Sequence, residues 1–124
     1  MHKQGRRGVM HVADAFVFSM KGLRAAWVHE TAFRLQSALL VPLVPLAFLI
    51  AQSAVELSLL LGACGLVLMA EMFNSAIERL VDRVSTDIHP LSGQAKDLGS
   101  AGVFIAMMLF LVVWLPIGWA NLAG

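Results

Sequence analysis

The chain has 124 residues, of which 59% are hydrophobic and only 14% are charged. Soluble domains carry roughly 25% charged residues, so this composition indicates a membrane protein and excludes soluble enzymes, nucleic-acid binders and secreted disulfide scaffolds. The single cysteine, Cys64, lies inside an apolar run, where we expect it to be a small packing residue. With a net charge of +1, bulk electrostatics say little about binding partners.

An amphipathic segment comes first, over about residues 5–28. At roughly 100° per residue, one helical face collects four polar residues: His11, Asp14, Lys21 and Arg24. This pattern predicts a helix that lies in the membrane interface, and Trp27 near its end suits the headgroup level. The segment either only anchors the chain or also covers an active site, and its pattern does not decide between the two.

Three long uncharged segments follow, at residues 35–55, 57–70 and 98–124. About 20 predominantly apolar residues cross a bilayer as a helix, so the first and third segments are long enough and the second must continue into charged residues. We therefore expect an all-α integral membrane protein, one domain over residues 1–124, with transmembrane helices at about 30–51, 54–85 and 92–121. Pro42 and Pro45 predict a kink in the first of these helices, because membrane helices tolerate proline.

The basic residues are distributed unevenly along the chain. Six of the nine precede the first apolar run: Lys3, Arg6, Arg7, Lys21, Arg24 and Arg34. The other three, Arg79, Arg83 and Lys96, lie between the second and third runs. Because basic residues are enriched in cytoplasmic segments, we expect the N-terminus in the cytoplasm and, after three crossings, the C-terminus outside.

The second helix carries a row of polar residues. Glu71, Asn74, Glu78 and Asp82 are spaced by 3, 4 and 4 residues, so they project from one helical face. If Glu56 marks the outer boundary, a rise of about 1.5 Å per residue places Glu71 roughly 22 Å into a hydrocarbon core of about 30 Å. A carboxylate at this depth is a functional candidate by default. The simpler alternative is a polar seam between helices, with Glu71 paired to a neighbouring cation.

Further charged groups reach the cytoplasmic boundary. Glu30 precedes the first apolar run, and Lys96 with Asp97 precedes the third. Carboxylates together with a lysine suit a magnesium-bound phosphate, because Mg²⁺ takes one or two carboxylates plus phosphate oxygens and lysine contacts phosphate as a point charge. Solvated charges at helix ends would explain the same residues more simply. Arg79 and Arg83 lie off the polar row, which favours surface or headgroup contacts. These residues alone do not name a reaction.

Three blocks of this sequence resemble the prokaryotic diacylglycerol kinase family. They are KGLRAAW with ETAFR in residues 21–34, EMFNSAIE through DR in residues 71–83, and SGQAKDLGSA in residues 92–101. The resemblance implies a small integral-membrane lipid kinase of the bacterial inner membrane, a homotrimer with three membrane helices and one amphipathic surface helix per subunit, and active sites built between subunits. It also implies MgATP-dependent phosphorylation of sn-1,2-diacylglycerol to phosphatidic acid, a step that recycles this lipid.

The resemblance also implies roles for individual residues. Glu71 corresponds to the catalytic base, Asn74 to a polar residue beside the reacting hydroxyl, and Glu30 and Glu78 to the carboxylates that bind the metal and the ATP phosphates. Other nucleotide-binding positions are Asp87, His89, Lys96 and Asp97. The lipid substrate is expected to border Glu71 and the residues Arg24, Trp27, Phe33, Gln36 and Ser100. Where the family places a basic residue and a tyrosine at the nucleotide, this chain has His11 and Phe18.

Two alternatives remain open from the sequence. An undecaprenol kinase of the same fold would use the same polar residues on a long polyprenol, and no residue decides between the two lipids. A small oligomeric proton-coupled transporter would instead use Glu71 as a proton site. That function predicts polar groups along the full membrane depth, whereas the stretch from Val103 to Trp114 is apolar throughout.

Overall fold

The structure, a computed structural model, describes residues 4–84 and 88–123. Its elements are all helices: α1 (Gln4–His29), α2 (Thr31–Leu40), α3 (Leu43–Ile50), α4 (Ala54–Val84) and α5 (Pro90–Ala123). No strand occurs in this part of the chain, which confirms the predicted all-α class. Three segments are long and apolar enough to cross a membrane, Thr31–Ile50, Ala54–Val84 and Pro90–Ala123, as the apolar runs predict.

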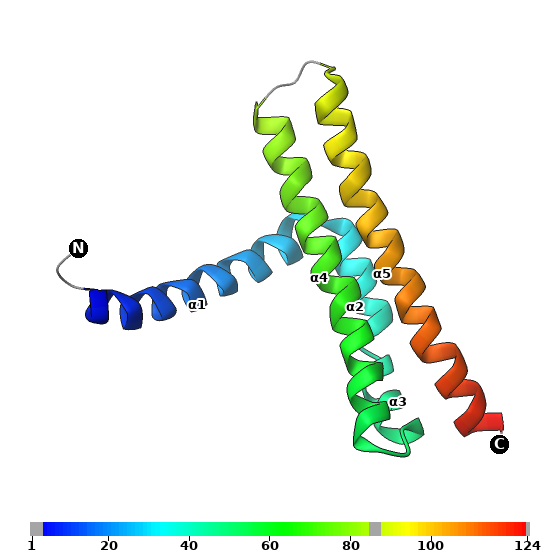
Figure 1. Ribbon diagram of the computed structural model, residues 1–124. Coiled ribbons are helices and arrows are strands. Elements are labelled where there is room, and N and C mark those ends of the chain that lie inside the picture. Colours follow the sequence, from blue (N-terminus) through cyan, green and yellow to red (C-terminus); the bar gives the residue numbers. More distant parts are fainter. Residues whose placement is uncertain (1–3, 85–87, 124) are drawn as a thin grey trace.

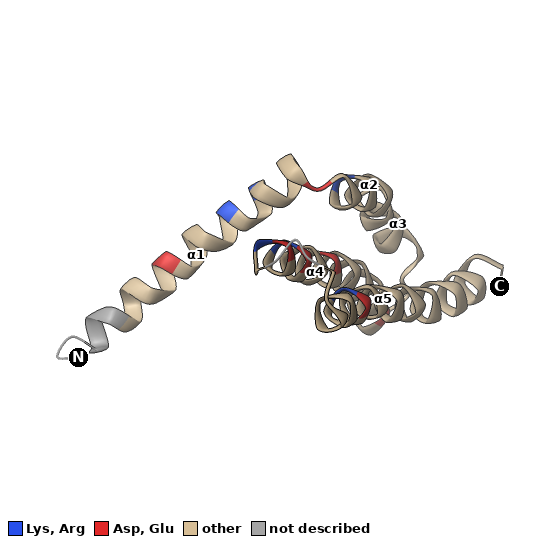
Figure 2. Ribbon diagram, turned by 90° about the horizontal axis from the view of Figure 1, so that it is seen from above, with Lys and Arg blue, Asp and Glu red and all other residues tan. Residues whose placement is uncertain are grey.

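The helices form a bundle from which one helix projects. α4 and α5 lie side by side, α2 and α3 pack along α4, and α1 leaves the bundle at a steep angle (Figure 1). Charged residues gather at one end of α4 and α5 and at the junction between α1 and α2 (Figure 2). The bundle therefore separates an apolar length of helix from one polar end, and α1 starts from that polar end.

The first span bends between α2 and α3. Pro42 and Pro45 have no N–H, so neither the Ala38 nor the Val41 carbonyl receives its usual helical hydrogen bond. Val41 and Pro42 nevertheless keep right-handed helical torsions, with φ of −57° and −63°, and the Val44 N–H donates to the Val41 carbonyl at 3.1 Å. The bend is a kink within one span, as the prolines predict.

The buried core is formed where α3, α4 and α5 meet. Its buried members on these helices include Ala47, Ile50, Leu60, Ala63, Cys64, Val67, Ala106 and Trp114. The Trp114 indole donates to the Leu60 carbonyl at 3.1 Å, which satisfies a polar group that hydrocarbon could not. Cys64 is buried and free, in agreement with its expected packing role.

A set of polar contacts ties the helices together at the end of the bundle far from the charged one. Asn121 donates from its side-chain amide to the Ile50 carbonyl at 2.8 Å and to the Glu56 carboxylate at 2.7 Å. Glu56 also accepts from the Gln52 N–H, and its own N–H donates to Ser53 Oγ at 3.1 Å. Ser53 followed three residues later by Glu56 is the pattern of a helix-capping box, so α4 begins here.

Candidate active site

The polar row on α4 runs from a buried to an exposed position. Glu71 is buried, with only 8% of its surface exposed, Asn74 is half-buried, and Glu78 and Asp82 are exposed. All four lie on one continuous helix that ends at Val84. The row therefore connects the interior of the bundle to its polar end without a break in the backbone.

Glu71 is covered from α2. The Gln36 side chain lies near the Glu71 carboxylate, and Gln36 Oε1 is buried without a hydrogen-bond partner in the described part of the chain. Glu78 and, more weakly, Glu30 lie close enough to act electrostatically on Glu71. Phe33, on the same helix as Gln36, is buried as well. A buried carboxylate thus lies near an acceptor that has no partner in the described part of the chain.

Asn74 connects the row to α5. Its amide nitrogen donates to Glu78 Oε1 at 3.2 Å, and its Oδ1 is buried without a partner among the described residues. The same oxygen lies against the backbone of Gly99, so closely that a Cβ at this position would collide with it. Only glycine at position 99 lets α5 approach the Asn74 side chain in this way. The close contact fixes the orientation of Asn74 towards Glu78.

The polar ends of α4 and α5 are joined by an ion pair. Lys96 Nζ lies 2.7 Å from Asp82 Oδ1, with both side chains substantially exposed. Asp97 and Ser100 follow on the exposed surface of α5. His89 accepts a hydrogen bond from the Leu91 N–H through Nδ1, next to the proline that begins α5. Lys96 is thus brought to the level of the polar row.

Asp87, the remaining expected nucleotide residue of this connection, lies outside the described residues.

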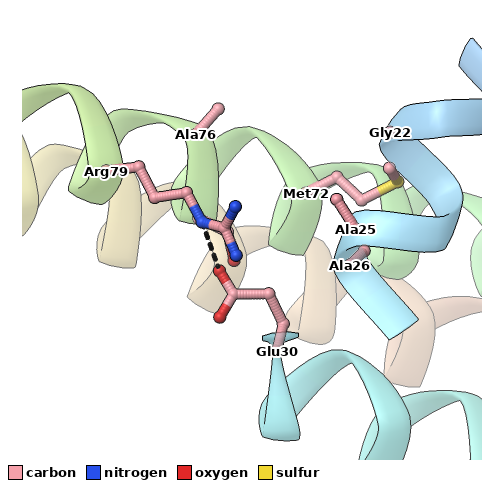
Figure 3. A pocket seen from close by; sticks show the side chains of 8 residues that line it. Gly22, Ala25, Ala26, Glu30, Met72, Ala76 and Arg79 are labelled. Atoms are coloured by element: carbon pink, nitrogen blue, oxygen red, sulfur yellow. Dashed lines mark ion pairs between the residues drawn. The ribbon is translucent and has the colours of Figure 1, made fainter. Parts of the chain in front are cut away.

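Glu30 lies at the junction of α1 and α2. It occupies the N-cap position of α2 with extended torsions (φ −111°, ψ 105°), but its side chain makes no capping hydrogen bond to that helix. Instead, Glu30 Oε1 lies 3.4 Å from Nε of Arg79 on α4 (Figure 3). The spacing of the polar row favours a surface or headgroup contact for Arg79, and the structure shows an exposed Arg79 whose partner is Glu30.

The junction is held by a second arginine. Arg34 donates from Nη1 to the carbonyls of Trp27 and Val28, at 2.6 and 3.0 Å, and from Nη2 to Thr31 Oγ1. These carbonyls belong to the last turn of α1 and have no partner within their own helix. Arg34 therefore caps α1 while the chain turns at Glu30, which fixes the direction in which α1 leaves the bundle.

A cavity of about 210 Å³ lies between α1 and α4 (Figure 3). Small and apolar side chains line most of it, and the Glu30–Arg79 pair closes one end. The lining residues are Gly22, Ala25, Ala26, Glu30, Met72, Ser75, Ala76 and Arg79. The cavity is too small for a whole lipid and suits part of an apolar chain or a small group beside the ion pair.

The expected site residues of α1 are exposed. Arg24 and Trp27 lie near the junction, whereas His11 and Phe18 lie further along the projecting helix. Phe18 has the ammonium of Lys21 5.8 Å from its ring centre. Because α1 projects away from the bundle (Figure 1), a single chain does not bring His11 or Phe18 to the polar row.

A divalent metal would find carboxylates but no complete protein cage here. Within residues 4–84 and 88–123, no group of three or more His, Cys, Asp or Glu side chains converges as a metal site. Mg²⁺ does not need one, because it is usually bound by one or two carboxylates with phosphate oxygens and waters completing its shell. Glu30 and Glu78 fit this requirement as carboxylates, since Glu30 makes no capping hydrogen bond and Glu78 is exposed at the polar end of α4.

Known proteins decide the family to which this site belongs. The sequence profile described as prokaryotic diacylglycerol kinase matches residues 17–117. The chain belongs to this family. It is 44% identical over 114 residues to a diacylglycerol kinase of Pseudomonas aeruginosa, covering 92% of this chain and 93% of that protein. It is 42% identical to the diacylglycerol kinase of Haemophilus influenzae (86% and 91% covered) and 40% identical to that of Escherichia coli K12 (92% and 93% covered).

Membership in the diacylglycerol kinase family was visible in the motifs, but three contacts of the site were not. The pairs Glu30–Arg79, Gln36–Glu71 and Asn74–Gly99 each join residues far apart in the chain. Helical spacing reports only which residues of one helix share a face. The contact between Asn74 and Gly99 has no signal in the spacing of either helix.

Replacing Gly99 with alanine tests this contact. The added Cβ collides with the Asn74 side chain, so we expect the variant to lose about 1–3 kcal/mol of stability, as overpacked positions do, measured as thermal unfolding in detergent micelles. Gly93→Ala is the matched control, because nothing lies within 4 Å of a Cβ at that position of the same helix. Equal unfolding temperatures for the two variants would contradict the close approach of α5 to Asn74.

Proposed function

We propose that the chain transfers the γ-phosphoryl group of MgATP to the free hydroxyl of sn-1,2-diacylglycerol, giving phosphatidic acid at the cytoplasmic face of a bacterial inner membrane. Family membership supports this reaction. The observation that carries the mechanism is the gradient along α4, from buried Glu71 to exposed Glu78. A lipid and a nucleotide come from different phases, and a row that joins those phases suits a reaction between them.

In the proposed orientation, the charged end of the bundle faces the cytoplasm. The basic residues flank this end, and cytoplasmic segments are enriched in them. The N-terminus is then cytoplasmic and the C-terminus periplasmic, with α1 lying along the inner surface of the membrane. ATP approaches from water, and diacylglycerol diffuses to the site within the bilayer.

Glu71 is proposed as the general base. It accepts the proton of the lipid hydroxyl while the hydroxyl oxygen bonds to the γ-phosphorus and the bond from phosphorus to the ADP oxygen breaks. Asn74 lies beside the reacting hydroxyl, and the close contact of its side chain with Gly99 holds it in position. Phosphoryl transfer depends on positioning and charge neutralisation more than on covalent chemistry, and a buried, oriented carboxylate supplies positioning.

Glu30 and Glu78 are proposed to hold the divalent ion, which neutralises phosphate charge when bound. Lys96 lies at the same end of the bundle and contacts the nucleotide as a point charge. Asp97 and His89 border the nucleotide from α5, and Asp87 is assigned to it by family resemblance alone. The lipid borders Arg24, Trp27, Phe33, Gln36 and Ser100.

A homotrimer with active sites between subunits is part of this proposal. The spans expose many large apolar side chains, which lipid or other subunits must cover. His11 and Phe18 lie too far along α1 to reach the polar row of their own chain (Figure 1). If they serve the nucleotide, as the family resemblance implies, they serve the site of another subunit.

One assay distinguishes the proposed reaction from the two alternatives, an undecaprenol kinase and a proton-coupled transporter. Purified protein in mixed micelles with MgATP is given diacylglycerol or undecaprenol, and phosphate transfer to each lipid is measured. We expect diacylglycerol to be the better substrate, because the family and the relatives carry that name. A preference for undecaprenol would show that undecaprenol, and not diacylglycerol, is the substrate. No phosphate transfer to either lipid, together with proton-dependent flux in proteoliposomes, would favour the transporter.

Replacing Glu71 with glutamine tests the proposed base. The amide keeps the shape but cannot accept the proton, so we expect turnover to fall by about 100-fold or more, while binding of a non-hydrolysable ATP analogue is retained. Glu56→Gln is the matched control, because it makes the same change at the far end of the same helix. Turnover of Glu71→Gln equal to that of Glu56→Gln would remove Glu71 from the mechanism.

A further inference from the structure

The Glu30–Arg79 ion pair joins two parts of the chain that sequence separates by 49 residues. Glu30 lies where α1 gives way to α2, and Arg79 lies in the exposed part of α4, directly after Glu78. The pair closes one end of the cavity between α1 and α4 (Figure 3). The pair therefore includes one of the two carboxylates that are proposed to hold the metal, and Arg79 directly follows the other, Glu78, in the chain.

The Glu30 carboxylate has no other role in the described structure that would explain its position. As the N-cap residue of α2, it could accept hydrogen bonds from the first backbone N–H groups, but it makes none. Its side chain turns to Arg79 instead. A guanidinium and a divalent ion at one carboxylate repel each other, so the two cations compete for Glu30.

The pair is suited to exchange. The side chains of Arg79 and Glu30 are 51% and 26% exposed, and ion pairs exposed to this degree contribute little to stability, because solvent screens the charges. A divalent ion carries twice the charge of the guanidinium and gains further ligands from phosphate oxygens. Arg79 can thus hold Glu30 before the metal arrives without preventing its binding.

We propose that Arg79 is a positioning residue that acts through Glu30. Its guanidinium holds the Glu30 carboxylate against α4 and gives up that carboxylate to the divalent ion when metal and nucleotide enter. Arg79 therefore lowers the apparent affinity for the metal–nucleotide complex. The inference rests on the proposed metal role of Glu30.

Binding of Mn²⁺ with adenylyl imidodiphosphate, a non-hydrolysable ATP analogue, tests this competition. Mn²⁺ is titrated into purified protein in micelles at a constant concentration of the analogue, and binding is followed by electron paramagnetic resonance. For Arg79→Gln we expect half-saturation at an about two- to fivefold lower concentration, the range expected for loss of an exposed ion pair. Arg79→Lys keeps the charge near Glu30 and should return half-saturation towards the wild-type value.

Arg83→Gln is the matched control. It removes the same charge from the same helix one turn further on, so it reports the general loss of positive potential. We expect it to change half-saturation less than twofold. Equal shifts for Arg79→Gln and Arg83→Gln would overturn the proposal, and so would an unchanged or weaker affinity in Arg79→Gln, which would make Arg79 a phosphate contact or a bystander.

A second variant at position 79 controls for misfolding. Arg79→Met keeps an apolar stem beside Met72 and Ala76 in the cavity wall. We expect it to lower the half-saturation concentration as much as Arg79→Gln does. Since the readout is binding, it does not depend on phosphate transfer. Loss of the proposed function would appear in the lipid assay of the wild type, whereas failure of this inference would appear only as an absent shift between wild type and the Arg79 variants.

Discussion

A carboxylate is costly inside a bilayer, and the position of Glu71 is the constraint on which the rest of the site depends. A charged group at membrane depth must face protein or water rather than lipid. Here α2 brings Gln36 near Glu71, and the helix that carries Glu71 continues without a break to exposed Glu78. The buried carboxylate and the aqueous end of the row are thus linked by one rigid element.

The neighbouring helices pack around this row on α4. α5 approaches Asn74 closely because position 99 is glycine, and Lys96 then meets Asp82 at the polar end. Arg34 caps α1 and directs it away from the bundle, which leaves Glu30 free to face α4. At the opposite end, Asn121 joins the Ile50 carbonyl to Glu56. Polar contacts hold both ends of the bundle, and apolar packing fills the length between them.

Helical spacing predicted the α4 row, the lengths of the apolar runs predicted the three spans, and Pro42 with Pro45 predicted the kink, because each feature depends on residues close together in the chain. The ion pair of Arg79 could not be predicted in this way, because its partner, Glu30, lies 49 residues away in the chain. The contacts of Gln36 with Glu71 and of Gly99 with Asn74 required the packing of separate helices. The roles of the site residues come from family resemblance and stay proposals. A single chain also leaves His11 and Phe18 away from the row, so their role depends on assembly.

The central claim is that Glu71 lies within the hydrocarbon while Glu78 lies beyond it. Nitroxide labels placed singly at Met69, Phe73, Leu80 and Val84, exposed positions of α4, test it in reconstituted bilayers with Cys64 replaced by alanine. Relaxation by oxygen should dominate at positions 69 and 73, and relaxation by a water-soluble nickel complex should dominate at 80 and 84. Nickel relaxation as strong at 69 and 73 as at 84 would place Glu71 in water and contradict the account.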